Sequence, residues 1–137
     1  MILSKLEIAK RQLEVAAQLY VDGADYLAVI TLAGAAEEIL GKLLRRTEQK
    51  CMADHIVELD KKLTGGRPFN VVSDEVNRAR NALKHARDQS EDLVKIEPGE
   101  ATAMIGRALL NFVRLVGQPT PVMQVAYLKF VSDVRQT

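Results

Sequence analysis

The chain has 137 residues and a formal net charge of +1, with hydrophobic residues at 47% of its positions. A chain of this length buries enough surface for one core, so residues 1–137 are expected to form a single domain. The balanced charge excludes a strong overall field for polyanions, and any attraction to nucleic acid therefore has to be local. The composition is rich in Ala, Leu, Glu, Lys, Arg and Gln, which predicts an all-α fold.

Cysteine and histidine usage gives no sign of disulfide or metal chemistry. Cys51 is the single cysteine, which indicates a reduced, cytoplasmic setting. His55 lacks the glutamate three residues earlier that metal sites in helical bundles use, so neither a metal nor another cofactor is expected. Met1 leads directly into a charged amphipathic segment, which predicts no signal peptide. The longest uncharged helical run, residues 26–36, is too short to cross a bilayer, so no membrane contact is expected.

The first part of the chain predicts a helical hairpin. Residues 4–21 carry apolar side chains at helical spacing and are expected to form a helix that ends at Gly23. A second helix, capped by Asp25, is expected to run to about Thr47, and the short connection makes the pair antiparallel. The expected buried positions are Leu6, Ala9, Leu13, Ala16 and Tyr20 in the first helix and Val29, Leu32, Ala33, Ala36, Ile39, Leu40 and Leu43 in the second.

Two further helices are expected in the middle of the chain. A third helix over residues 53–63 is expected to end at the glycine pair that follows it. Residues 67–70 contain Pro68 and are expected to form a loop. Ser73 then caps a fourth helix, which fades after Asp88. The positions of the third helix that are expected to face inward are Ile56, Leu59 and Leu63.

The last part of the chain predicts two more helices. After a polar connection over residues 89–97, Pro98 suits the first turn of a fifth helix that ends near Gly117. Thr120 caps a sixth helix over residues 121–135. The expected buried positions are Met104, Ala108, Leu109, Phe112, Val113 and Val116 in the fifth helix and Val122, Val125, Ala126, Leu128 and Val131 in the sixth. The whole pattern predicts an up-and-down bundle of five to six helices.

The fourth predicted helix contains residues 80–85, which read Arg80-Asn81-Ala82-Leu83-Lys84-His85. On one continuous helix, a turn of about 100° per residue gathers the polar side chains on one side and the apolar ones on the other. A guanidinium and an imidazole without an adjacent acid indicate an anion-binding face, and phosphate is the commonest biological anion. The polar side is Asn77, Arg80, Asn81, Lys84, His85 and Asp88, and the apolar side is Val76, Ala79, Leu83 and Ala86.

These residue types suit the cleavage of a phosphodiester without a metal. In RNA the 2′-hydroxyl is itself the nucleophile, and an imidazole exchanges protons near neutral pH. A guanidinium holds the charge that develops on phosphorus through a bidentate contact. His85 is therefore expected to transfer a proton, Arg80 to hold the phosphate and Asn81 to orient one of them. The alternative interpretation of the same spacing is a solvated helix face that carries one incidental histidine.

The second predicted helix holds an acidic residue at the edge of its apolar stripe. Glu37 lies there between Gly34 and Gly41, and each glycine weakens a helix by about 1 kcal/mol relative to alanine. A close approach by another helix would compensate for that cost. The carboxylate also needs a partner, for which Arg80 or another base of the fourth helix is suitable. An ordinary salt bridge with tight packing inside one subunit explains the pattern equally well.

With these residues in view, the chain resembles the HEPN domain family. Residues 80–85 match the arginine, polar residue, spacer and histidine of that family, and residues 32–44 look like the second helix of prokaryotic members. The resemblance implies a helical bundle that forms a homodimer, with two such motifs facing one cleft that binds RNA or a nucleotide. Many members are metal-independent endoribonucleases, often toxins or defence effectors. Others are inactive modules that bind a nucleotide, a nucleic acid or a protein partner.

The resemblance also implies roles for single residues. Arg80 and His85 would form the catalytic pair, with Asn81 as their polar neighbour. The substrate-binding positions would be Asn77, Arg78, Lys84 and Arg87, with Glu37 or Glu38 as acidic support. Toxin members that pair with an antitoxin often carry a tyrosine two residues after the histidine, where this chain has Arg87. Control by modification of that tyrosine is therefore not expected, and an antitoxin or another partner protein stays an open possibility.

Overall fold

The computed structural model describes residues 1–65, 67, 69–87 and 89–136. Within these ranges the chain is all-helical, as predicted, and contains no strand. It forms seven α-helices there, where five to six were expected, together with one short 3₁₀ helix. The elements are α1 (Lys5–Val21), α2 (Tyr26–Arg46), α3 (Met52–Thr64), α4 (Phe69–Val76), α5 (Arg78–Lys84), η1 (Gln89–Glu91), α6 (Pro98–Val116) and α7 (Pro121–Arg135).

The predicted hairpin of α1 and α2 is confirmed. The Ser4 hydroxyl accepts a hydrogen bond from the Glu7 amide at 3.0 Å, and the Asp25 carboxylate accepts one from the Leu27 amide at 2.9 Å. Each cap satisfies an amide at a helix start that has no partner within the helix. Gly23 has a φ of +65°, a conformation that glycine adopts without a steric cost, and the chain reverses direction there.

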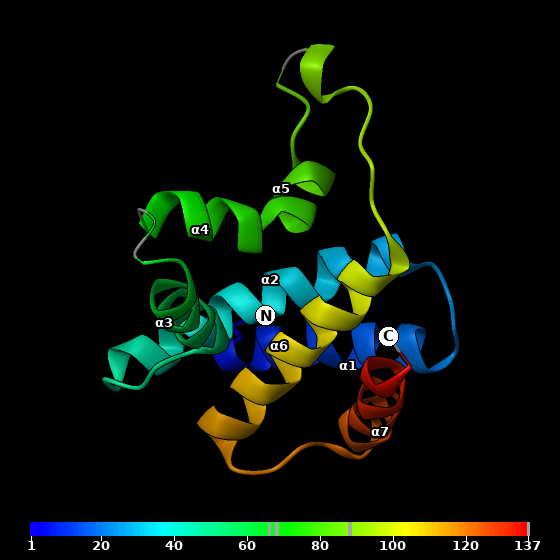
Figure 1. The fold of residues 1–137 in the computed structure, drawn as a ribbon. Coiled ribbons are helices and arrows are strands. Elements are labelled where there is room, and N and C mark those ends of the chain that lie inside the picture. Colours follow the sequence, from blue (N-terminus) through cyan, green and yellow to red (C-terminus); the bar gives the residue numbers. More distant parts are fainter. Residues whose placement is uncertain (66, 68, 88, 137) are drawn as a thin grey trace.

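The body of the molecule consists of α1, α2, α6 and α7, which bury one apolar core (Figure 1). In this body α2 and α6 run in the same direction, because Tyr26 at the start of α2 lies beside Ile96 and Glu37 further along α2 lies beside Arg107 of α6. The up-and-down order therefore holds for α1 and α2 but not for α2 and α6, which α3, α4 and α5 connect. Among the described residues, no helix is both long and apolar enough to span a bilayer.

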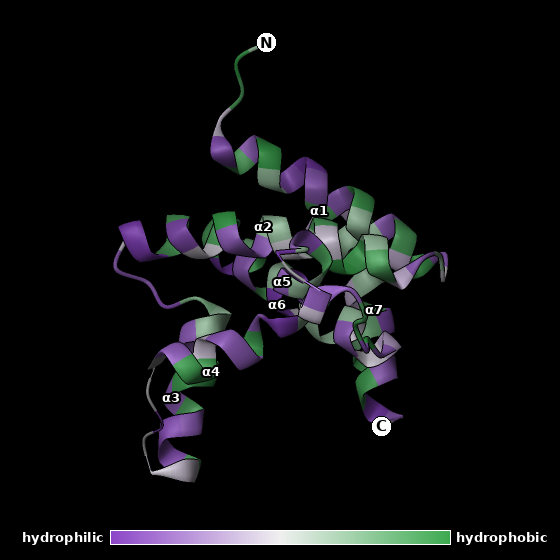
Figure 2. Ribbon diagram, turned by 90° about the horizontal axis from the view of Figure 1, so that it is seen from above, coloured by the Kyte–Doolittle hydropathy of each residue, from purple (hydrophilic) through white to green (hydrophobic). Residues whose placement is uncertain are grey.

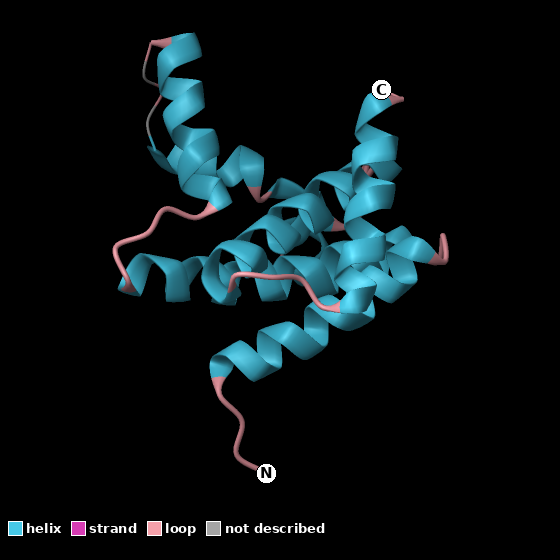
Figure 3. Cartoon of the chain, turned by 90° about the horizontal axis from the view of Figure 1, so that it is seen from below, coloured by secondary structure: helices cyan, strands magenta, loops and turns pink. Residues whose placement is uncertain are grey.

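α3 differs from its prediction in what it buries. It begins and ends within one residue of the expected bounds, and Gly65 terminates it with a φ of +82°. However, Leu59 is 56% exposed and Leu63 is 75% exposed, and no described residue inside α3 is buried. Figures 2 and 3 show the reason, which is that α3 projects from the body and packs mainly against α4 and the end of α6.

The prediction of a single helix that starts at Ser73 and fades after Asp88 is wrong, because the chain forms two short helices, α4 and α5, in this region. α4 already begins at Phe69, so residues 69 and 70 are helical and Ser73 lies inside α4 rather than at its cap. The helix breaks at Asn77, and α5 ends at Lys84. Pro68 and Asp88 lie outside the described residues. After α5 the chain leaves the body, and η1 lies at the tip of the connection to α6 (Figure 1).

α6 follows its prediction closely, and α7 follows it in part. Pro98 is the first residue of α6, and Gly117, with a φ of +102°, ends the helix. The exceptions in α6 are Val113, which is partly buried, and Val116, which is exposed. In α7, Thr120 stands at the cap position without a side-chain cap bond. The buried residues of α7 are Met123 and Ala126, whereas Val125 and Leu128 of the predicted stripe are exposed.

The contact between α6 and α7 accounts for this rotation of the buried stripe. A Cβ atom on Gly106 would overlap the ring of Phe130, so the glycine leaves the space that this ring fills. Packing of Phe130 against Gly106 turns Met123 and Ala126 toward the core. No signal in the helical spacing of α7 alone distinguishes this stripe from the neighbouring one.

Candidate functional site

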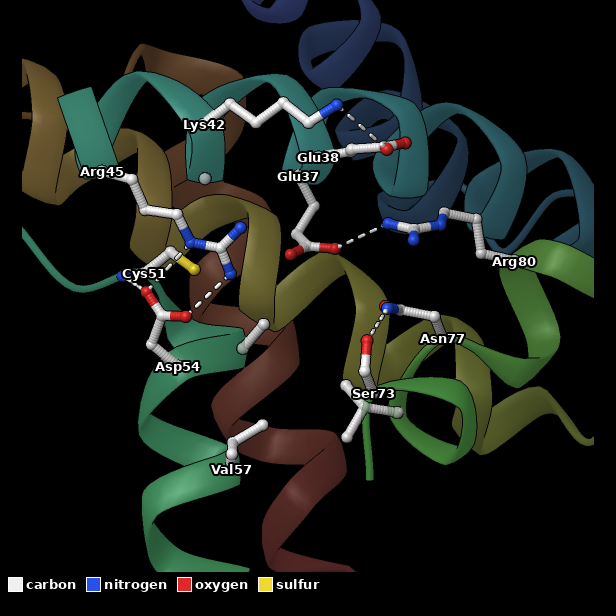
Figure 4. Close-up of a pocket in the computed structure, with 13 residues that line it drawn as sticks. Glu37, Glu38, Lys42, Arg45, Cys51, Asp54, Val57, Ser73, Asn77 and Arg80 are labelled. Atoms are coloured by element: carbon white, nitrogen blue, oxygen red, sulfur yellow. Dashed lines mark hydrogen bonds and ion pairs between the residues drawn. The ribbon is translucent and has the colours of Figure 1, made fainter. Parts of the chain in front are cut away.

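A buried carboxylate on α2 is the central electrostatic feature of the structure. Glu37 is 3% exposed, and its Oε2 atom accepts hydrogen bonds from Arg80 Nη1 at 3.3 Å and from Arg107 Nη2 at 3.0 Å. Both arginines are themselves 8% exposed. We call these three residues the Glu37 triad; Figure 4 shows the contact between Glu37 and Arg80. The ion pair that was expected between Glu37 and a base of the fourth helix is therefore present.

The close approach expected at Gly34 is also present, and the Arg80 side chain makes it. A Cβ atom on Gly34 would lie 2.8 Å from both Cγ and Cδ of Arg80. The absence of a side chain at position 34 thus lets the arginine stem lie against α2 on its way to Glu37. Gly41 is different, since a Cβ there would lie 3.5 Å from Cys51, an ordinary contact distance.

Sequence reasoning missed Arg107, the third member of the triad. Its Nη1 atom donates to the Val76 carbonyl at 2.8 Å, and its Nη2 atom donates to Asn77 Oδ1 at 3.0 Å as well as to Glu37. The signal was present in the sequence, because Arg107 and Asn111 are polar residues one turn apart within the apolar stripe of α6. Polar residues at such positions need buried partners.

A cavity of about 250 Å³ adjoins the triad between α2, α3, α4 and α5, and we call it the α2 pocket (Figure 4). Its charged groups are largely paired with one another. Lys42 Nζ lies 3.5 Å from the Glu38 carboxylate, and Arg45 Nη2 lies 2.7 Å from the Asp54 carboxylate. The polar and charged residues that line it are Glu37, Glu38, Lys42, Arg45, Asp54, Ser73, Asn77 and Arg80.

Two titratable groups in the α2 pocket have shifted pKa values. Hydrogen bonding by Arg45, with a smaller contribution from the Cys51 amide, lowers the pKa of Asp54, so this carboxyl group stays charged to lower pH than usual. Burial raises the pKa of the Cys51 thiol, which keeps the thiol protonated at neutral pH. The thiolate is the reactive form of cysteine, so Cys51 is not equipped to act as a nucleophile.

A second cavity, of about 630 Å³, lies between α5 and the connection to α6, and we call it the His85 pocket. It brings the His85 imidazole together with the Asn81 amide and several cationic side chains. Arg78 is tied to Glu100 and to the Lys95 carbonyl, which lies 3.2 Å from its Nη1 atom. The charged residues that line the pocket are Asp74, Arg78, Arg87, Glu91 and Lys95, and Leu93 and Val94 give it an apolar side.

The structure divides the predicted site residues between the two pockets. Arg80 and His85 were expected on one helix face, but within one chain they line different cavities. Neighbouring residues of α5 already differ by about 100° around its axis, so Arg80 lines the α2 pocket whereas Asn81 lines the His85 pocket. His85 lies beyond the end of α5 at Lys84 and has extended backbone with φ −123° and ψ 142°. Lys84 is exposed and lines neither pocket. The α2 pocket receives Glu37, Glu38, Asn77 and Arg80, and the His85 pocket receives Arg78, Asn81, His85 and Arg87.

The other histidine of the sequence lies apart from both pockets. His55 is exposed on α3, as expected for an outer polar face. In the part of the chain that the structure describes, no three His, Cys, Asp or Glu side chains gather as metal ligands would. Comparisons of the chain with family models, with curated proteins and with solved structures find no match.

The triad predicts unequal effects for two adjacent glutamates. Glu37→Gln leaves two buried guanidinium groups without a counter-charge, and we expect it to lower the free energy of unfolding by about 3–5 kcal/mol. Glu38→Gln removes only an exposed pair with Lys42 and should cost less than about 0.5 kcal/mol. Urea denaturation of both variants checks this, and equal losses would show that the triad does not stabilise the fold.

Two glycines of α2 should respond in opposite ways to alanine. Gly34→Ala places a methyl group against the Arg80 stem, and we expect a loss of about 1–2 kcal/mol in unfolding free energy. Gly41→Ala meets only ordinary contacts and should gain about 0.5–1 kcal/mol from better helix propensity. Thermal and urea unfolding measure both. A gain in both variants would mean that Arg80 does not need the space at Gly34.

The pKa shift of Asp54 predicts a dependence of stability on pH. The folded state lowers this pKa below its ordinary value of about 3.9. The stability that charged Asp54 contributes is therefore complete above that ordinary value and is lost as the pH falls through the folded-state pKa. Between about pH 5 and about pH 2, the wild-type protein should therefore lose more of its unfolding free energy than the Asp54→Asn variant does. Denaturation curves across that range test this, and parallel losses would contradict it.

Proposed function

We propose that this protein is a metal-independent endoribonuclease of the HEPN type that acts as a homodimer. The observation that carries the proposal is the His85 pocket, where an imidazole, an amide and the cationic side chains of Arg87 and Lys95 line one cavity. Imidazole supplies proton transfer near neutral pH, and cationic side chains bind a phosphodiester. The resemblance of residues 80–85 to the HEPN motif supports the choice of RNA as the polyanion.

The proposed reaction uses the RNA itself as the nucleophile. The 2′-oxygen forms a bond to phosphorus as its proton passes to an imidazole, and the bond from phosphorus to the 5′-oxygen breaks as that oxygen receives a proton. The products are a 2′,3′-cyclic phosphate and a 5′-hydroxyl. His85 of one protomer would take the first proton and His85 of the other would supply the second, which is the reason that the reaction calls for two copies.

Within this proposal the role of Arg80 changes from that of a phosphate ligand. Its guanidinium is buried and bound to Glu37, so it is a positioning residue that fastens α5 to α2. Arg87 and Lys95 take over the contact with phosphate, because both are exposed and both line the His85 pocket. Asn81 from α5 would orient either the imidazole or a phosphate oxygen.

The burial of Arg80 favours a second candidate function, an inactive HEPN-like module that binds a nucleotide, a nucleic acid or a protein partner. If catalysis needs this guanidinium at the phosphate, the Glu37 triad withholds it. The same His85 pocket would then bind a ligand without cleaving it. The two candidates share a binding site and differ only in turnover, so one set of variants can separate them.

The two histidines of the chain provide a matched test of the proposal. Purified protein is incubated with unstructured RNA in EDTA, and the products are analysed for 2′,3′-cyclic phosphate ends. We expect His85→Ala to lower the cleavage rate by about 10²–10⁴-fold, since that is the usual contribution of a general acid or base. His55→Ala, which changes an exposed residue of α3, should cleave at the wild-type rate.

Binding is measured in parallel by fluorescence anisotropy of labelled RNA. Binding without any cleavage by the wild-type protein would select the inactive module. Cleavage that is equal in His85→Ala and the wild type would refute the assignment of His85 in either form. Sedimentation of the wild-type protein as a monomer under the conditions of cleavage would refute the homodimer.

A further inference from the structure

We propose that Arg107 is a positioning residue that fixes the break between α4 and α5 and thereby decides which side chains enter each pocket. It acts from α6 as the third member of the Glu37 triad, and it lines neither the α2 pocket nor the His85 pocket. Its effect on RNA cleavage rests on the proposed function, but its effect on the position of His85 does not.

The first support is the hydrogen bond that Arg107 makes at the break itself. In an uninterrupted helix the carbonyl of Val76 would accept a bond from the amide four residues later, that of Arg80. α4 instead ends at Val76, whose carbonyl accepts from Arg107 Nη1 at 2.8 Å. The guanidinium therefore satisfies a helix-end carbonyl at a part-buried position.

The second support is the hold that Arg107 has on Asn77, the residue at the break. Asn77 has φ −102° and ψ 8°, which departs from helical geometry. Its Oδ1 atom accepts a hydrogen bond from Arg107 Nη2 at 3.0 Å, and the same nitrogen also donates to Glu37. One rigid, planar group thus fixes the end of α4, the side chain at the break and the carboxylate that binds Arg80.

The third support is the distribution of residues around the broken segment. Ser73, Asn77 and Arg80 line the α2 pocket, and their chain neighbours Asp74, Arg78 and Asn81 line the His85 pocket. Adjacent residues of a helix differ by about 100° around its axis. A change in the angle or rotation of α5 at the break would therefore move Arg80 and Asn81 together, and would displace His85, which follows directly after α5.

The test uses proton NMR of the imidazole rings in the free protein. The sequence contains two histidines, so His55 on the exposed face of α3 serves as an internal reference in every spectrum. Arg107→Lys keeps the charge but removes the planar fork, and we expect the His85 ring resonances to shift while those of His55 stay unchanged. Arg114→Lys, at an exposed position of the same helix, is the matched control and should move neither histidine.

A second variant covers the case in which Arg107→Lys does not fold, as judged by circular dichroism. Asn77→Ala keeps Arg107 and removes one of its three acceptors, so we expect a smaller shift of the His85 signals in the same spectra. Unchanged His85 signals in a folded Arg107→Lys protein would overturn the proposal. If that protein is unfolded, unchanged His85 signals in Asn77→Ala would overturn it.

If the protein cleaves RNA, Arg107→Lys should lower kcat by about 10²-fold while KM changes little, because a small misplacement of a proton-transfer group slows the chemical step more than binding. A protein that shows the NMR shifts and does not cleave RNA would retain the positioning role and lose the proposed function. Cleavage of RNA by the wild-type protein without any NMR shift in Arg107→Lys would support the proposed function and overturn the positioning role of Arg107.

Discussion

The arrangement of this protein depends on one buried carboxylate and the two guanidinium groups that share it. Removing Glu37 from water is costly unless cations and hydrogen-bond donors replace the solvent, and Arg80 and Arg107 provide both. These arginines come from α5 and α6, so the ion pairs join three segments that are distant in the sequence. Each arginine leaves its Nε atom without a hydrogen bond among the described residues, so the Nη atoms make the hydrogen bonds that hold the triad together.

The same interactions explain why the polar face of the motif does not remain one face. α5 has to turn Arg80 toward α2 to reach Glu37, and the bonds of Arg107 to Val76 and Asn77 stabilise the break that allows this. His85 then falls beyond the end of α5 and lies beside the projecting connection to α6. The need to pair buried Glu37 inside the body thus influences the shape of the His85 pocket, where we place the proposed cleavage of RNA.

The two pockets differ in how their charges are used. In the α2 pocket the acidic and basic groups form ion pairs with one another, so few of its charges are left to bind a ligand. In the His85 pocket Arg87 and Lys95 stand on the projecting segment, and Lys95 has only an exposed pair with Glu97 at 3.7 Å. Asp74 and Glu91 line the same cavity, and the apolar side chains of Leu93 and Val94 are exposed beside them. This second combination of exposed cationic and apolar side chains suits a ligand with both a phosphate and a base.

The sequence by itself determined the all-α class, the hairpin of α1 and α2, the bounds of α6 and the need of Glu37 for a basic partner. These features follow from local spacing, from caps and from the cost of an unpaired buried charge, all of which act within one segment. Only the tertiary structure decided the break at Asn77, the exposure of Leu59 and Leu63, the buried stripe of α7 and the separation of Arg80 from His85. Each of these depends on a partner from another element, such as Arg107 for Asn77 or Gly106 for Phe130, and helical periodicity in one segment carries no information about the side chain that another segment brings to it.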